Sequence, residues 1–114
     1  MENTYKKTTQ TIVYISGAIT GYSPQEYLTK FAEVERRLTA RGYVVVNPAR
    51  INDRLPHAAN GDFAFTHEGY MNISYALLEL CDYIYVIDGE STSKGVKLEI
   101  EYAKNYGIPR LHLV

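Results

Sequence analysis

The stretch TIVYISGAITGYSPQE, residues 11–26, places a strand, a glycine loop and a helix start in succession. Residues 11–16 are mostly β-branched and aromatic and are followed by a glycine, which is typical of a buried strand. Ser23 has the properties of a helix N-cap, because Pro24 follows at the first helical position and Glu26 can complete a capping box. A strand that leads through a loop into a helix is the repeating unit of α/β folds.

The remainder of the chain continues this alternation. The first helix ends at Gly42, and the next predicted strand, 43–46, is stopped by Asn47-Pro48. Residues 49–68 are rich in Asn, Asp, Pro and Gly and show no period, so a long functional loop is expected there. The later predicted elements are a helix at 69–80, a strand at 83–87, a helix at 94–106 and a strand at 110–114.

Alternating strands and helices favour a parallel sheet with helices on both faces. We therefore predict an α/β, Rossmann- or flavodoxin-like fold with about four to five strands. Residues 1–10 are interpreted as a polar N-terminal tail, and residues 11–114 as a single domain. Ligands of such folds bind beyond the carboxyl ends of the strands, so function is sought in the loops that follow them.

Composition and charge indicate which kinds of partner, location and metal site to expect. A hydrophobic share of 46% and a net charge of −1 over 114 residues describe an ordinary globular chain and favour neither a nucleic acid polymer nor a membrane as partner. The first ten residues lack the apolar segment of a signal peptide, so a cytoplasmic location is expected. Cys81 is the only cysteine, and the three histidines lack ligand spacing, so no metal and no cofactor are predicted.

One acidic residue of the last helix interrupts an apolar face. At 100° per residue, Glu99 falls within the arc formed by Val96, Ile100, Ala103 and Tyr106. A carboxylate in that position loses solvation unless it is hydrogen-bonded or lines a pocket, and its pKa is then shifted. The alternative is a glutamate at the edge of the arc that bends out to water, and the pattern alone favours neither.

A serine interrupts the apolar arc of the preceding helix. Ser74 lies among Met71, Tyr75 and Leu78 at helical spacing. A serine in such a place commonly bonds back to a carbonyl of its own helix, and this structural interpretation is favoured over a functional one.

Four segments of the chain carry a resemblance to a known family. They are VYISGAITG (13–21), GYVVVNPA (42–49), LLELCDYIYVIDG (77–89) and SKGVKLEIEYAKNYGIP (93–109). Together they resemble the nucleoside 2-deoxyribosyltransferase superfamily and its small bacterial and phage members. Their most specific part is the G-x-x-x-E spacing from Gly95 to Glu99, with Ser93 two residues before the glycine. The sequence is also similar to deoxynucleoside monophosphate N-glycosidases.

The resemblance implies transfer or hydrolysis of a 2′-deoxyribosyl group without a cofactor. In such enzymes the glutamate that matches Glu99 attacks the sugar and forms a glycosyl ester, and the tyrosine that matches Tyr14 orients it. Tyr14 can equally be a core residue of its strand. The implied partner is a small-molecule nucleoside or nucleotide, and a homo-oligomer is expected by analogy.

The resemblance also implies substrate contacts from the strand-end loops. Glycines allow backbone N–H groups of the first loop, including Ser16, Gly17, Thr20 and Gly21, to approach an anion. Ser93 would add a hydroxyl at a helix N-terminus. The first loop lacks the arginine of the N-glycosidases, for which Arg50 or Arg54 is a substitute to consider.

Two further strand-end residues have structural alternatives. Asp88 and Asn47 are expected near the sugar or base, although Asp88-Gly89 is also a common turn pair and Asn47 can simply shape its turn. Tyr22 and Tyr70 lie close to the predicted site loops and can stack on a base.

The main departure from the family pattern is Ser74, where these enzymes usually have an aspartate that contacts the sugar or assists departure of the base. A serine cannot act as a general acid at neutral pH. The alternative function is therefore a catalytically weak or inactive binding module for a nucleotide or nucleotide-derived ligand.

Overall fold

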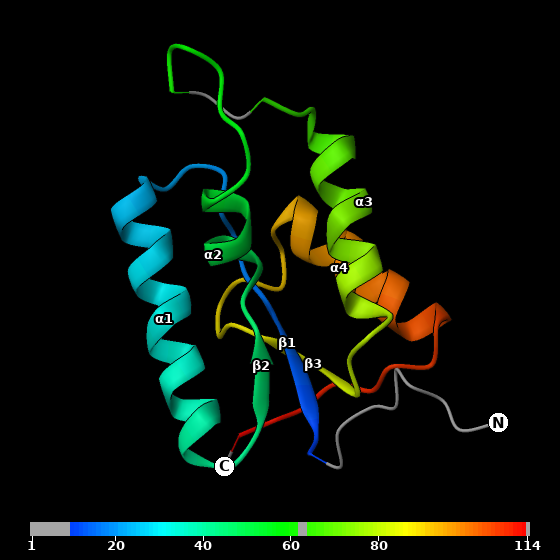
Figure 1. The fold of residues 1–114 in the computed structure, drawn as a ribbon. Helices are drawn as coiled ribbons and strands as arrows, with labels where there is room; N and C mark the ends of the chain where they lie inside the picture. The colour runs from blue at the N-terminus through cyan, green and yellow to red at the C-terminus, as the bar shows by residue number, and fades with distance from the viewer. Residues whose placement is uncertain (1–9, 62–63, 114) are drawn as a thin grey trace, which may run out of the picture.

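The computed structural model describes residues 10–61 and 64–113, so all but Gln10 of the predicted polar tail lies outside the described residues. Its elements follow one another as shown in Figure 1. They are β1 (Ile12–Ser16), α1 (Pro24–Ala40), β2 (Val44–Val46), α2 (Pro48–Asp53), α3 (His67–Leu78), β3 (Tyr83–Val86) and α4 (Lys94–Asn105).

The sheet is parallel and has the strand order β2-β1-β3. This confirms the predicted α/β class, but the prediction of four to five strands is wrong, because three strands are present in the described part of the chain. The segment predicted as a last strand forms one parallel bridge, between Arg110 and Ile84. Pro109 precedes it and has no N–H to donate, and beyond the bridge Leu111 and Leu113 pack against the core.

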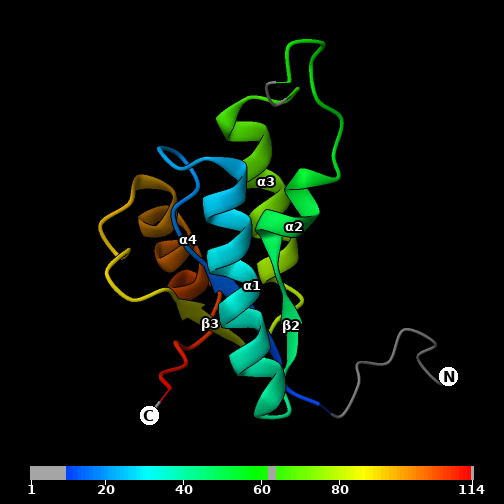
Figure 2. The same ribbon diagram turned by 90° about the vertical axis from the view of Figure 1, so that its left-hand side faces the viewer.

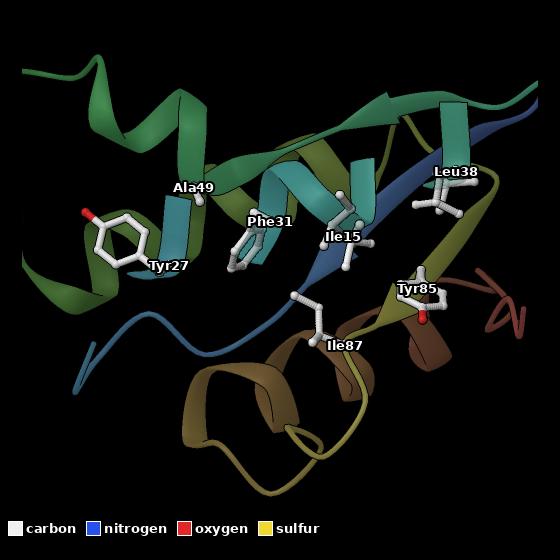
Figure 3. Packing of buried hydrophobic residues seen from close by; sticks show 9 residues of the cluster. Ile15, Tyr27, Phe31, Leu38, Ala49, Tyr85 and Ile87 are labelled. Carbon is white, nitrogen blue, oxygen red and sulfur yellow. The ribbon is translucent and has the colours of Figure 1, made fainter. Parts of the chain in front are cut away.

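Strand β1 is buried on both faces, which explains its nearly continuous apolar sequence. Val13 and Ile15 face α1 and belong to one cluster with the buried side chains of that helix. Figure 3 shows Ile15 on this side of the sheet together with Phe31 and Leu38 of α1. Tyr14 faces the opposite side and belongs to the cluster formed with α3 and α4. Full burial of a side chain such as Phe31, which is 0% exposed, contributes about 1.5–3 kcal/mol.

Two helix starts use the same local chemistry. The predicted capping box of α1 is confirmed, with Ser23 accepting from the Glu26 N–H and Glu26 accepting from the Ser23 N–H. Asn47 also caps a helix, because its side chain accepts from the Arg50 N–H. The expectation of a loop from residue 49 onward is therefore wrong for its first part, which is the short helix α2.

The chain order places β1 and β3 side by side, while the helices that follow them lie on opposite faces of the sheet. Figures 1 and 2 show α1 on one face and α3 with α4 on the other. The loops after β1 and β3 therefore diverge, which creates the crevice where open parallel sheets bind ligands. Among the described helices, none is both long enough and apolar enough to span a membrane.

Candidate functional site

A cavity of about 690 Å³ lies at this crevice. Its wall is formed by the loop after β1, by α1 to α3 and by the start of α4. The lining residues are Gly17, Ala18, Ile19, Thr20, Phe31, Pro48, Asn52, Phe65, His67, Tyr70, Met71, Ser74, Ser93, Lys94, Gly95 and Glu99. This volume is typical of a small-molecule site, and most of the wall is apolar.

Glu99 lies on the second turn of α4 and is only 7% exposed. The Ser16 hydroxyl donates to Glu99 Oε1 over 2.6 Å, and the Tyr14 phenol donates to Glu99 Oε2. Tyr14 and Ser16 are alternate residues of β1, so their side chains leave the strand on the same face. Glu99 is therefore buried and fixed by the strand end, and the alternative in which it bends out to water is excluded.

Burial raises the pKa of Glu99 to about 7, because desolvation penalises the charged carboxylate. Hydrogen bonds from Ser16, Tyr14 and Ser74 act in the opposite direction and stabilise the ionised form. Burial and the nearby carboxylate raise the pKa of the Tyr14 phenol well above its ordinary value, so Tyr14 remains a neutral donor. Near neutral pH, Glu99 is consequently present both as a carboxylate and as an acid.

The loop after β1 is held by an ion pair between Lys30 and Glu90. The Ala18 N–H donates to Glu90 over 2.7 Å, and Lys30 Nζ donates to the Ala18 carbonyl over 2.9 Å. Lys30 and Glu90 are themselves 2.6 Å apart and largely buried. The Ala18 amide is thus already bonded to a carboxylate, which makes this part of the loop unfavourable for a phosphate.

Gly17 is closely surrounded by side chains, so a larger residue there would force its neighbours to move. A Cβ atom at this position would lie 2.6 Å from Ile87 Cδ1 and 3.0 Å from both Glu90 Oε1 and Phe31 Cζ. Gly95 has room, since its Cβ would meet nothing closer than Met71 Sδ at 4.0 Å. The two cavity glycines therefore serve different purposes, and at Gly95 the missing side chain leaves space beside Glu99.

The predicted site residues separate into three groups. Those in the cavity wall are Glu99, Ser74, Gly17, Thr20, Ser93 and Gly95. Tyr14 and Ser16 contact Glu99 from the strand. Gly21, Asn47 and Asp88 are not part of the wall.

The structure shows the local surroundings of these three residues, and a ligand contact from any of them stays a prediction. Gly21 has a φ of +92°, which favours glycine in the turn before α1. Asn47 caps α2 and its amide donates to Glu35 over 3.0 Å. Asp88 is exposed at the end of β3.

The arginines considered for phosphate also lie outside the wall. Arg50 pairs with Glu35 over 3.1 Å, and Arg54 is exposed at the C-cap of α2. Of the two tyrosines considered for stacking, Tyr70 lines the cavity, whereas Tyr22 lies against Lys30, whose Nζ is 3.8 Å from its ring centroid.

Several lining residues were not predicted from the sequence, namely Phe31, Pro48, Asn52, Phe65, His67, Met71 and Lys94. Met71 shares the helical arc of Ser74, so it was accessible to the same projection. Asn52 lies on α2, whereas the sequence predicts a loop there because Asn47-Pro48 is interpreted as the end of a strand. Within residues 10–61 and 64–113, no three His, Cys, Asp or Glu side chains gather as metal ligands would.

The fold and the cavity define an α/β protein with a buried carboxylate at the β1/β3 crevice. Residues 11–111 match a family described as a domain of unknown function (DUF4406), and the chain belongs to that family. Among solved structures, the fold is similar to that of a 2-deoxyribosyltransferase from Bacillus psychrosaccharolyticus. The TM-score is 0.64 at 16% identity, covering 90% of this chain and 76% of that one. The predicted likeness to this superfamily is thereby confirmed for the fold, and a search of curated proteins finds no match.

Proposed function

We propose that the protein cleaves or transfers the N-glycosidic bond of 2′-deoxynucleosides or their 5′-monophosphates, with Glu99 as the nucleophile. The observation that carries this proposal is the buried carboxylate of Glu99, which faces a mostly apolar cavity and is oriented by Tyr14 and Ser16. Support also comes from the fold, which is similar to that of a protein described as a 2-deoxyribosyltransferase. A homo-oligomer and a cytoplasmic location remain expectations from the resemblance.

The reaction has two displacement steps. The ionised carboxylate of Glu99 attacks C1′, the bond from C1′ to the base nitrogen breaks, and its electron pair leaves with the base, which takes a proton from water. Water or a second base then attacks C1′, the bond from C1′ to the Glu99 oxygen breaks, and the attacking group gives its proton to the hydroxide left by the first step. A carboxylate suits both steps, because it stabilises the oxocarbenium-like charge and can also trap it covalently.

The hydroxyl groups around Glu99 set its geometry and its charge. With Tyr14 and Ser16 donating to different oxygens, the carboxylate is held in one orientation. Both bonds favour the ionised form, against the burial that raises the pKa of Glu99 to about 7. A nucleophile with this pKa is ionised in a useful fraction near neutral pH and is only weakly solvated.

A second candidate function is favoured by Ser74. Ser74 is 6% exposed and lines the cavity near Glu99, where a serine supplies a hydrogen bond but no acidic proton. Departure of the base would then depend on water, which lowers the rate of the first step. A module that binds a nucleoside or nucleotide with little or no turnover is therefore the alternative.

A 5′-phosphate has little cationic support in the cavity. Among the lining residues that the structure describes, Lys94 is the only one with a permanent positive charge, and it adjoins Ser93, whose side chain makes no capping bond to α4. The Ala18 N–H is bonded to Glu90. Nucleosides and monophosphates must therefore both be tested.

The test is chromatographic. Purified protein is incubated with each 2′-deoxynucleoside and each 5′-monophosphate, with and without a second free base, and base release or exchange is measured. The expected result is turnover that is lost in Glu99→Gln and kept in Glu101→Gln, since Glu101 is exposed on the same helix. No turnover in the folded wild-type protein with any substrate would reject the enzyme and leave the binding module.

A further inference from the structure

We infer that Asn52 recognises the ligand by accepting a hydrogen bond from an N–H group on the edge of the base, an inference that rests on the proposed function. Asn52 lies on α2 and lines the same cavity as Glu99. The family resemblance assigns this residue no role, and the sequence placed it in a loop.

The side chain of Asn52 is buried without being satisfied. It is 7% exposed, and its Oδ1 atom has no hydrogen-bond partner among the residues that the structure describes. A buried carbonyl that loses its hydrogen bonds to water and gains no others destabilises the folded chain. Such a group is rarely retained by packing alone, and its place in a cavity wall indicates that the missing partner comes with the ligand.

The surroundings of Asn52 are suited to a flat, mostly apolar ring. Pro48, Phe31, Phe65 and Tyr70 share the cavity wall with it, and the rings of Phe65 and Tyr70 meet edge to face at 5.6 Å. A nucleobase buries its faces against such side chains and needs hydrogen-bonding partners only at its edge. Asn52 is a polar group on that apolar side of the cavity.

Asn52 and Glu99 approach the cavity from different sides of the sheet. Helix α2 packs against α1 and β1, whereas α4 packs against α3 (Figure 1). A nucleoside likewise has two distinct ends, with the reacting carbon C1′ at one end and the hydrogen-bonding edge of the base at the other. A ligand whose C1′ meets Glu99 can therefore direct its base toward α2.

The required ligand group is an N–H donor. Adenine and cytosine carry an exocyclic amino group, guanine carries both an amino group and a ring N–H, and thymine carries a ring N–H. Unsubstituted purine, attached to deoxyribose through nitrogen, has no N–H. An asparagine amide can hydrogen-bond the edge of a base and so distinguish bases by the groups that they carry there.

The experiment measures equilibrium binding by calorimetry in a Glu99→Gln background, so that turnover cannot remove the ligand. The ligands are the four 2′-deoxynucleosides and purine 2′-deoxyriboside. Asn52 is replaced by Leu, which has a similar size without hydrogen bonding, and by Asp, which retains acceptor oxygens. Asn72→Leu, at an exposed position on α3, is the matched control.

At least one natural nucleoside is expected to bind about tenfold or more tightly than purine 2′-deoxyriboside. Asn52→Leu should remove that preference and leave the Kd of purine 2′-deoxyriboside within twofold. Asn52→Asp should keep much of the preference. Without ligand, Asn52→Leu should be at least as stable to urea as the parent, because an unsatisfied buried carbonyl is replaced by an apolar group.

Three results would overturn the inference. In Asn52→Leu, the affinity for all ligands could fall equally, or the preference for natural nucleosides over purine 2′-deoxyriboside could stay unchanged. The third result is that the parent protein binds no nucleoside. If Asn52→Leu does not fold, the comparison of natural nucleosides with purine 2′-deoxyriboside in the parent protein still decides, since equal Kd values would overturn it. Failure of this inference can be distinguished from failure of the proposed reaction. Discrimination through Asn52 with no base release by wild-type protein would support the inference and reject catalysis, and base release without discrimination would do the reverse.

Discussion

Replacement of Glu99 by Gln should remove a pH dependence from the stability of the protein. Glu99 has a pKa of about 7 in the folded chain, raised by burial from an ordinary value of 4.5. Below pH 4.5 the carboxyl group is protonated in the folded and unfolded states alike, and its favourable contribution to folding is complete. As the pH rises from there through 7, the unfolded chain releases the proton first, so stability is lost.

The magnitude follows from the same two values. The difference between 4.5 and about 7 corresponds to about 3 kcal/mol at 1.36 kcal/mol per pKa unit. Gln has nearly the same shape and no charge, and the Ser16 and Tyr14 hydroxyls can rotate to donate or accept. Glu99→Gln should therefore be more stable than wild type by up to about 3 kcal/mol at pH 8, with the difference shrinking toward pH 4.5.

The assay is urea unfolding of both proteins at intervals between pH 4.5 and 8.5. Glu101→Gln is the control, because Glu101 is exposed on the same helix and should give a curve parallel to wild type. The difference between wild type and Glu99→Gln isolates this one carboxyl group from the other titrating groups. Parallel curves for these two proteins across the whole range would refute a buried, destabilised carboxylate.

Three further substitutions test the surroundings of Glu99. Tyr14→Phe removes a hydrogen bond that favours the ionised form, so the pKa of Glu99 should rise above about 7, as measured by carboxyl NMR titration; an unchanged pKa would contradict the geometry. Gly17→Ala should lower stability by about 1–3 kcal/mol, because its Cβ would lie 2.6 Å from Ile87 Cδ1, and an unchanged urea midpoint would contradict this. Lys30→Met should lower stability by roughly 1–3 kcal/mol, because it leaves the largely buried Glu90 carboxylate and the Ala18 carbonyl without their cation. Amide hydrogen exchange in the loop after β1 should also become faster, and an unchanged exchange rate there would contradict this role of Lys30.

The α/β fold was predictable because its local signals agree with one another. The strand at residues 12–16, the cap at Ser23 and the apolar arc of the last helix each have a short-range cause that sequence displays. The count of strands was not predictable in this way. Residues 110–113 alternate in burial as a strand does, but pairing depends on a neighbour's backbone and on Pro109, and it extends to a single bridge.

The candidate site was predictable where it depends on helical periodicity and not where it depends on tertiary arrangement. Glu99 and Ser74 were both found from their position on an otherwise apolar arc, and both are buried in the cavity wall. Asn52 was missed because Asn47-Pro48 can end a strand or begin a helix, and the choice depends on packing against α1. The close packing around Gly17 could not be predicted from the sequence either, because the three side chains near it come from different parts of the chain.

The most direct test of Glu99 as a nucleophile is mass spectrometry of the protein quenched in acid during reaction with a 2′-deoxynucleoside. A glycosyl ester should appear as an added 2′-deoxyribosyl mass, and peptide mapping should place it on Glu99. The adduct should be absent from Glu99→Gln and present in Glu101→Gln. Release of base with no adduct, or an adduct on another residue, would contradict covalent catalysis by Glu99.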